Sequence, residues 1–180
     1  MTRTGQVTLV TGGARSGKSA WALAQASALP GRRVLLATAE ARDEEMRHRI
    51  LRHQQERGDE WETVETPLEV PECLRSLRTR SEVVLLDCLT MWVSNLMETG
   101  HDPLEAFARL RQELQTPSRS DVFLVTNEVG LGIVPENAMA RQFRDLAGSL
   151  NQEVAAVANR VVLVVSGIPV TVKETRMSGL

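Results

Sequence analysis

QVTLVTGGARSGKSAWALAQASAL, residues 6–29, passes from a β-branched run through a glycine-bracketed turn into an Ala/Leu-rich segment. The spacing G-x-x-x-x-G-K-[ST] is satisfied by Gly12, Gly17, Lys18 and Ser19. In this pattern backbone amides surround a phosphate, the lysine reaches the outer phosphates, and the hydroxyl binds Mg²⁺. The helix that follows directs its positive end to the same place. Because the required strand and helix flank the turn, the stretch predicts a phosphate site and not a glycine-rich turn with a solvated lysine.

Further runs of strand length recur at residues 33–38, 82–87, 121–127 and 160–167, and 169–173 predicts an additional edge strand. Near-continuous Val and Leu are typical of strands buried on both faces of a parallel sheet. Helical periodicity fills the intervals at 19–29, 43–57, 67–79, 89–98, 103–115 and 135–158, and residues 57–70 are the least regular region. This alternation predicts one α/β domain over 1–180, with a mostly parallel central sheet and helices on both faces.

Length and charge narrow the class of function. At 180 residues the chain suits one domain, and its net charge of -2 does not supply the basic field that nucleic-acid binding needs. Cys73 and Cys88 match no metal spacing, and the sequence carries neither a signal peptide nor an apolar run of about 18 residues. We therefore expect a cytoplasmic protein with reduced thiols, no nucleic-acid partner and no integral membrane segment.

A phosphate loop needs a second, acidic Mg²⁺ ligand at the end of another strand. Asp87 follows four apolar residues in VVLLDC and suits this role. Aspartate at a strand-to-helix junction is also a common N-cap, so capping of a helix from Leu89 is the alternative, and the two roles are compatible. The sequence thus predicts a metal site at Ser19 and Asp87.

The end of the fourth buried run argues against a guanine-nucleotide switch, because TNEVG at 126–130 stands where such proteins carry Asn-Lys-x-Asp. A motor ATPase is usually larger than this chain, so its size favours a small-molecule transferase or kinase. The overlapping segment 127–137, NEVGLGIVPEN, has two interpretations. It is either an apolar-lined loop that grips a bulky ligand, or a loop that tucks Leu131, Ile133 and Val134 into the core.

Residues 42–57, RDEEMRHRILRHQQER, are charged like a helix at the protein surface. Helical spacing, however, places His53 on the inward-facing apolar stripe and His48 away from it. Arg49 and Arg57 would flank His53 one turn away on either side. Two arginines favour anionic oxygens and disfavour protonation of the imidazole, which keeps a ring nitrogen available as a nucleophile. A histidine on an apolar stripe is more often a core or boundary residue, so both interpretations of His53 stay open on these grounds.

Six segments together resemble a known family. They are LVTGGARSGKS, ATAEARDEEMRHRILRH, the tryptophan of EWETVE, LLDCLTMWVSNL, TNEVGLGIVPENAMARQFRDLAGSLNQEVA and LVVSGIPV, in order over about Val7 to Val172. The family is the bifunctional adenosylcobinamide kinase / adenosylcobinamide-phosphate guanylyltransferase of cobalamin biosynthesis. The resemblance implies a RecA-like P-loop NTPase fold and a homotrimer.

The resemblance also implies two reactions. ATP or GTP, with Mg²⁺, phosphorylates the aminopropanol hydroxyl of adenosylcobinamide. GMP then passes from GTP to a histidine and on to the new phosphate, which gives adenosylcobinamide-GDP and pyrophosphate. A kinase without guanylyl transfer and a nucleotide-binding regulatory module are the alternatives, and no base-reading motif decides between ATP and GTP in the first step.

Residue roles follow from the same resemblance. His53 matches the guanylylated histidine, and Lys18 is the catalytic lysine of the phosphate loop. The nucleotide contacts of the family fall on Gly12, Gly13, Ala14, Arg15, Ser16, Gly17, Lys18, Ser19, Ala37, Thr38, Ala39, Gln54, Gln55, Glu56, Arg57, Glu65 and Asp87. The family commonly has Arg-Pro before the tryptophan, whereas Gly58 follows Arg57 here. His101 we expect at the surface.

Overall fold

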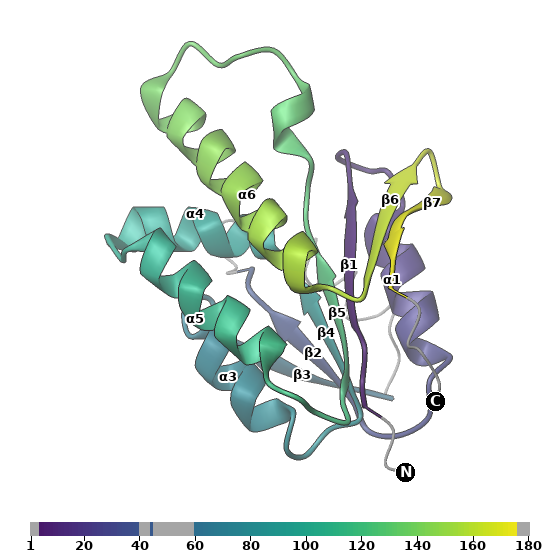
Figure 1. Cartoon of the computed structure of the whole chain (residues 1–180). Coiled ribbons are helices and arrows are strands. Elements are labelled where there is room, and N and C mark those ends of the chain that lie inside the picture. The colour runs from purple at the N-terminus through teal and green to yellow at the C-terminus, as the bar shows by residue number, and fades with distance from the viewer. Residues whose placement is uncertain (1–3, 40–43, 45–59, 176–180) are drawn as a thin grey trace.

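A computed structural model of the chain describes residues 4–39, 44 and 60–175. Within these residues one seven-stranded sheet has the order β3-β2-β4-β5-β1-β6-β7 (Figure 1). The strands are β1 (Val7–Gly12), β2 (Arg33–Ala37), β3 (Trp61–Glu65), β4 (Val83–Asp87), β5 (Asp121–Val125), β6 (Arg160–Val165) and β7 (Ile168–Glu174). Strands β1 to β6 are parallel and β7 pairs antiparallel with β6, so six carboxyl ends lie at one edge of the sheet.

Helices lie on both faces of this sheet. On one face α1 (Lys18–Ser27) packs on the central strands β1, β4 and β5. The other face carries α3 (Val70–Leu77), α4 (Leu89–Thr99), α5 (Pro103–Gln115) and α6 (Ala138–Val157). A 3₁₀ turn, η1 (Val129–Leu131), lies between β5 and α6. The predicted fold class, a mostly parallel sheet with helices on both faces, is confirmed.

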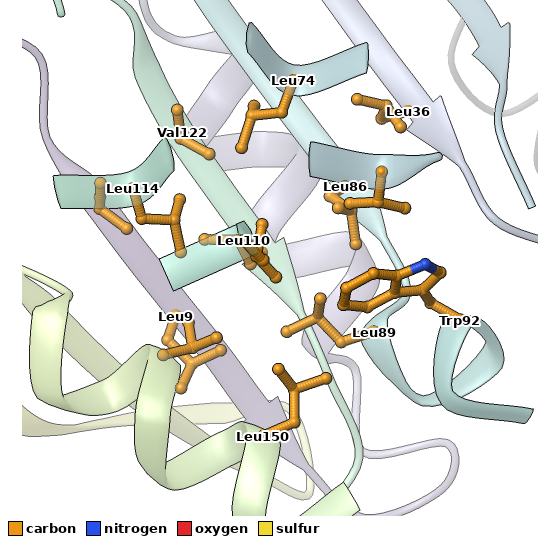
Figure 2. Close-up of a cluster of buried hydrophobic side chains, with 14 of the residues drawn as sticks. Leu9, Leu36, Leu74, Leu86, Leu89, Trp92, Leu110, Leu114, Val122 and Leu150 are labelled. Atoms are coloured by element: carbon orange, nitrogen blue, oxygen red, sulfur yellow. The ribbon is translucent and has the colours of Figure 1, made fainter. Parts of the chain in front are cut away.

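Alternation along the buried strands creates two cores, because successive side chains of a strand point to opposite faces. Leu9 and Leu86 belong to the core under α3 to α6, where Figure 2 shows them beside Leu89, Leu110 and Leu150. Val10 and Leu85, which adjoin Leu9 and Leu86 along β1 and β4, join the α1 core instead. The continuous apolar runs seen in the sequence are therefore explained by burial on both faces.

The structure corrects the sequence interpretation at residues 57–70, which were expected to be irregular. Residues Trp61–Glu65 form β3, an edge strand parallel to β2. Trp61 is buried against α1 and donates its indole N–H to Ser27 Oγ at 3.2 Å, while Glu65 is exposed at the strand end. The predicted edge strand at 169–173 is confirmed as part of β7. The helix predicted over 43–57 falls almost wholly outside the described residues.

Side-chain caps set two helix starts. Asp102 accepts hydrogen bonds from the amides of Leu104 and Glu105, so α5 begins at Pro103 as predicted. α6 begins at Ala138, three residues later than expected, because the Asn137 side chain accepts from the Ala140 amide and caps the helix there. No helix in the described ranges 4–39 and 60–175 combines the length and apolar character of a membrane span.

Candidate nucleotide-binding site

The phosphate loop connects the end of β1 to the start of α1, as its sequence predicted. Gly17 is the N-cap of α1 and has φ 92°, a left-handed conformation that favours glycine. Lys18 is the first residue of the helix, and its Nζ donates to the Gly13 carbonyl at 3.1 Å. The Ser16 amide also donates to the Gly13 carbonyl, at 3.2 Å, so the loop turns tightly after Gly13. This arrangement holds the lysine across the mouth of the loop.

A hairpin turn packs behind the loop, which the sequence did not predict. The β6 and β7 strands are joined by Ser166 and Gly167, both with positive φ, as in the two-residue turns that suit hairpins. The Gly167 amide donates to the Ser16 carbonyl at 2.8 Å. The edge hairpin therefore contacts the phosphate loop at Ser16, and Ser166 and Gly167 do not line the cavity described next.

A cavity of about 670 Å³ opens at the carboxyl edge of the sheet. Eight of the predicted nucleotide-binding residues line it: Ala14, Arg15, Lys18, Ser19, Ala37, Ala39, Glu65 and Asp87. They come from the phosphate loop and from the ends of β2, β3 and β4. Other lining residues were not predicted as site residues: Leu35, Thr63, Cys88, Thr90, Met91, Ser94, Asn127, Glu128, Val129, Gly132 and Phe143. The volume is that of a small-molecule or cofactor site.

Five predicted contacts that fall in the described residues do not line this cavity: Gly12, Gly13, Ser16, Gly17 and Thr38. The first four form the turn itself, where backbone amides are the groups that approach a phosphate. Thr38 is fully buried, and its hydroxyl donates to the Cys88 carbonyl at 2.8 Å and accepts from the Cys88 amide at 3.0 Å. Its side chain thus joins the ends of β2 and β4.

Asp87 is not the N-cap of α4, so the capping alternative is wrong. The N-cap is Cys88, which makes no side-chain capping bond, and Asp87 lines the cavity together with Ser19. Within the described residues no group of three His, Cys, Asp or Glu side chains could hold a metal by itself. One hydroxyl and one carboxylate facing a phosphate loop fit Mg²⁺, which usually keeps waters and completes its shell with substrate phosphates.

Cys88 follows Asp87, and we expect its thiol to be unreactive at neutral pH. Burial, and then the charge of Asp87, raise the pKa of the Cys88 thiol to about 11. Cys88 therefore stays protonated at neutral pH. We assign it no nucleophilic role.

The 127–137 loop leaves β5 at the same edge and projects beyond the sheet before it returns to α6 (Figure 1). Leu131, Ile133 and Val134 are 81%, 96% and 60% exposed, so the interpretation that they enter the core is wrong. Asn127, Glu128, Val129 and Gly132 line the cavity. Glu128 was missed as a site residue, although TNEVG offered a signal: an acidic residue just beyond a strand end.

Part of the predicted site lies outside the described residues. This holds for the predicted nucleophile His53, for His48, and for the nucleotide contacts Gln54, Gln55, Glu56 and Arg57. His101, expected at the surface, is exposed, and its Nδ1 lies 2.8 Å from Thr99 Oγ1.

The fold matches solved P-loop structures. RadB recombinase aligns with a TM-score of 0.53 and 16% identity, covering 89% of this chain and 74% of that chain. A prototypical ATPase of the type III secretion system of pathogenic bacteria aligns with a TM-score of 0.54 and 12% identity, covering 89% of this chain and about half, 51%, of that chain. Likeness at this identity shows the fold alone. Together with the loop and Asp87, it defines the chain as a P-loop nucleotide-binding protein.

The chain belongs to the cobinamide kinase / cobinamide phosphate guanyltransferase family, whose model matches residues 8–172. The "Bifunctional adenosylcobalamin biosynthesis protein CobU" of Escherichia coli (strain K12) is 44% identical over 182 residues, covering 92% of this chain and 98% of the relative. A Pseudomonas aeruginosa relative, "Bifunctional adenosylcobalamin biosynthesis protein CobP", is 41% identical over 171 residues, covering 92% of this chain and 96% of its own. The family resemblance stated from the sequence is confirmed.

Proposed function

We propose that the chain is a bifunctional enzyme of adenosylcobalamin biosynthesis, acting as adenosylcobinamide kinase and adenosylcobinamide-phosphate guanylyltransferase. One observation carries the proposal: the phosphate loop, Asp87 and the 127–137 loop all open onto a single cavity. Membership of the family supports both activities. The first step uses ATP or GTP and the second uses GTP.

In the kinase step, charge on the transferred phosphoryl group is stabilised mainly by position and electrostatics. Lys18 and the amides of the phosphate loop would face the outer phosphates. Ser19 and Asp87 would hold Mg²⁺, which neutralises charge on the phosphate oxygens when it is bound. The hydroxyl of adenosylcobinamide attacks the γ-phosphorus, and a nucleoside diphosphate leaves.

In the transferase step we propose His53 as the nucleophile. A neutral ring nitrogen attacks the α-phosphorus of GTP, a P–N bond forms, and the bond to the bridging oxygen of pyrophosphate breaks. The phosphate of adenosylcobinamide phosphate then takes GMP from the histidine. Sequence register and family membership support this assignment, together with Gln54 to Arg57 as nucleotide contacts.

The corrinoid is much larger than a nucleotide, so it needs surface outside the cavity. The exposed aliphatic side chains of Leu131, Ile133 and Val134 support a corrinoid contact on the 127–137 loop, whose first residues line the cavity. Exposed apolar side chains that gather on one segment commonly mark a binding surface.

We also propose that the chain folds as one domain over 1–180, acts in the cytoplasm, where its nucleotide substrates are found, and assembles as a homotrimer. The edge hairpin supports assembly, because Val165 on β6 and Ile168, Val170 and Val172 on β7 are exposed. An apolar edge strand favours pairing with another chain.

Turnover tests the proposed function. Purified protein is incubated with adenosylcobinamide, Mg²⁺ and either ATP or GTP, and corrinoid products are followed by chromatography and mass. The proposal predicts adenosylcobinamide phosphate with ATP, with GTP or with each of them. It predicts conversion to adenosylcobinamide-GDP, with release of pyrophosphate, only when GTP is present. EDTA should abolish both products. Nucleotide binding that no corrinoid affects would instead indicate a regulatory module.

A further inference from the structure

Glu128 is a cavity-lining carboxylate that the mechanism above does not use. It follows β5 and lines the same cavity as Lys18 and Asp87. Asp87 is committed to the metal in the proposed mechanism, and Glu65, the third carboxylate on this cavity, is exposed at the edge of the sheet on β3. Glu128 instead lies beside the phosphate loop, because its amide donates to the Gly12 carbonyl at 3.1 Å.

The carboxylate of Glu128 is held in one orientation. Its Oε1 accepts a hydrogen bond from Thr11 Oγ1 at 2.7 Å and a longer one from Asn151 Nδ2 at 3.4 Å. Thr11 lies on β1, immediately before the phosphate loop, and Asn151 lies on α6. Within the described residues both recorded hydrogen bonds to this carboxylate use Oε1, which leaves Oε2 as the oxygen available to a ligand in the cavity.

A buried polar network fixes Asn151 in turn. Thr126 Oγ1 donates to Asn151 Oδ1 at 2.7 Å, and Asn151 Nδ2 donates to the Asn127 carbonyl at 3.2 Å. The Asn127 amide donates to Thr90 Oγ1 at 2.8 Å. Thr90, Thr126 and Asn151 are all buried. Satisfied buried networks rigidify the groups they contain, so the orientation of Glu128 is tied to β1, α4 and α6 together.

To link β1 to α6 by hydrogen bonds, Glu128 needs only an acceptor oxygen. Glutamine would supply that oxygen as well as glutamate does. What glutamate adds is a carboxylate in place of a neutral amide, with Oε2 outside the two hydrogen bonds that hold Oε1. A general base must reach the proton that it removes, and an oriented carboxylate is a common solution. Phosphate-loop kinases need a group of this kind to orient the attacking hydroxyl.

We propose that Glu128 accepts the proton of the acceptor hydroxyl in the phosphorylation step. As the alcohol oxygen bonds to the γ-phosphorus, its proton moves to Glu128 Oε2. The bond from the γ-phosphorus to the bridging oxygen breaks, the nucleoside diphosphate leaves with the electron pair, and Glu128 later releases the proton to solvent. This role rests on the proposed kinase function and supplies the base that its mechanism lacks.

The test compares Glu128→Gln with Glu105→Gln, a matched loss of one carboxylate at an exposed position of α5 outside the cavity. Single-turnover phosphorylation of adenosylcobinamide is followed with γ-labelled GTP, alongside GTP affinity and thermal stability. Glutamine can still accept from Thr11 and Asn151, so Glu128→Gln should keep its melting temperature and bind GTP within about threefold of wild type. Its phosphorylation rate should fall about 10²- to 10⁴-fold, the usual contribution of a general base.

The outcomes separate this role from the function on which it rests. A Glu128→Gln rate within threefold of Glu105→Gln would overturn the role of Glu128 and leave the kinase function standing. A wild-type protein that phosphorylates the corrinoid with neither GTP nor ATP would overturn both.

If Glu128→Gln does not fold, a second variant tests the same role of Glu128. Glu128→Ala removes the carboxylate, and added formate should raise its phosphorylation rate at least tenfold. A folded Glu128→Ala that formate does not rescue would contradict a proton-accepting role.

Discussion

Gly17 and Gly167 are in close contact: a Cβ on Gly17 would lie 3.2 Å from the Gly167 Cα. Gly17 caps α1 in the phosphate loop, and Gly167 is in the turn between β6 and β7. The Gly167 amide donates to Ser16 in the same contact. The phosphate loop therefore packs against the β6–β7 hairpin, which lies far from it in the sequence.

This contact makes Gly17→Ala costly. Alanine would be strained at φ 92° and crowded by Gly167, and a left-handed residue other than glycine costs on the order of 1–3 kcal/mol. We expect the melting temperature to fall by about 5 °C, since 1 kcal/mol shifts a chain of this size by roughly 2–4 °C. Gly13→Ala is the control in the same loop, because a Cβ there meets nothing within 4 Å. Equal losses in the two variants would contradict the role of the contact.

Lys18→Met should weaken GTP binding. The Lys18 ammonium lies across the loop, and charge-assisted hydrogen bonds are worth about 1.5–3 kcal/mol, so we expect roughly 10- to 150-fold lower affinity by calorimetry. The control is Lys173, the other lysine of the sequence, whose Nζ donates to the carbonyls of Ala155 and Ala156 at the end of α6. Lys173→Met should bind GTP as wild type does. Similar losses in both would point to a general effect of charge.

The sequence predicted the buried strands because burial on both faces leaves a continuous apolar run, as in VVLLD of β4. β3 escaped for the opposite reason. Its sequence WETVE contains no continuous apolar run: Trp61 is buried, Glu62 and Val64 are half-buried, and Thr63 and Glu65 are exposed. Edge strands of five residues with this composition resemble loops, so only their pairing with a neighbour reveals them.

Within the site, local motifs predicted Lys18, Ser19 and Asp87, because each stands at a fixed spacing or directly after a strand. Glu128 also follows a predicted strand, in TNEVG, but no fixed spacing distinguishes it from an ordinary loop residue. Its position depends on hydrogen bonds to Thr11 and Asn151, which are 117 and 23 residues away in the chain. The contact of Gly167 with the phosphate loop likewise depends on the tertiary fold.

The exposed hairpin leads to a prediction about assembly. Ile168→Glu places a charge on the apolar surface of β7, where burial against another subunit would be opposed by the cost of desolvating the carboxylate. Light scattering after size exclusion should give a trimer for wild type and a smaller species for Ile168→Glu. Leu104→Glu, at an exposed apolar position on α5, should remain trimeric. A monomeric wild type would contradict the proposed assembly.

The raised pKa of Cys88 predicts slow alkylation. With the pKa of the Cys88 thiol raised from 9.0 to about 11 by burial and by Asp87, the thiolate is roughly one hundredth as abundant at pH 8 as in an unperturbed thiol. Iodoacetamide should label Cys88 fast only after unfolding, as read by peptide mass spectrometry. Because the folded state holds this proton more tightly, the free energy of unfolding should fall as pH rises from about 9 to 11. Cys88→Ser should weaken that dependence without removing it, since burial also raises the pKa of Cys73.

Guanylylation of a histidine on this phosphate-loop fold is tested most directly by intact mass spectrometry after incubation with GTP and Mg²⁺. Wild type, His53→Ala and His48→Ala are compared, with an acid step to detect a phosphoramidate. We predict an acid-labile GMP adduct on wild type and on His48→Ala, and none on His53→Ala. A wild type that binds GTP but forms no adduct, or an adduct that persists in His53→Ala, would contradict it.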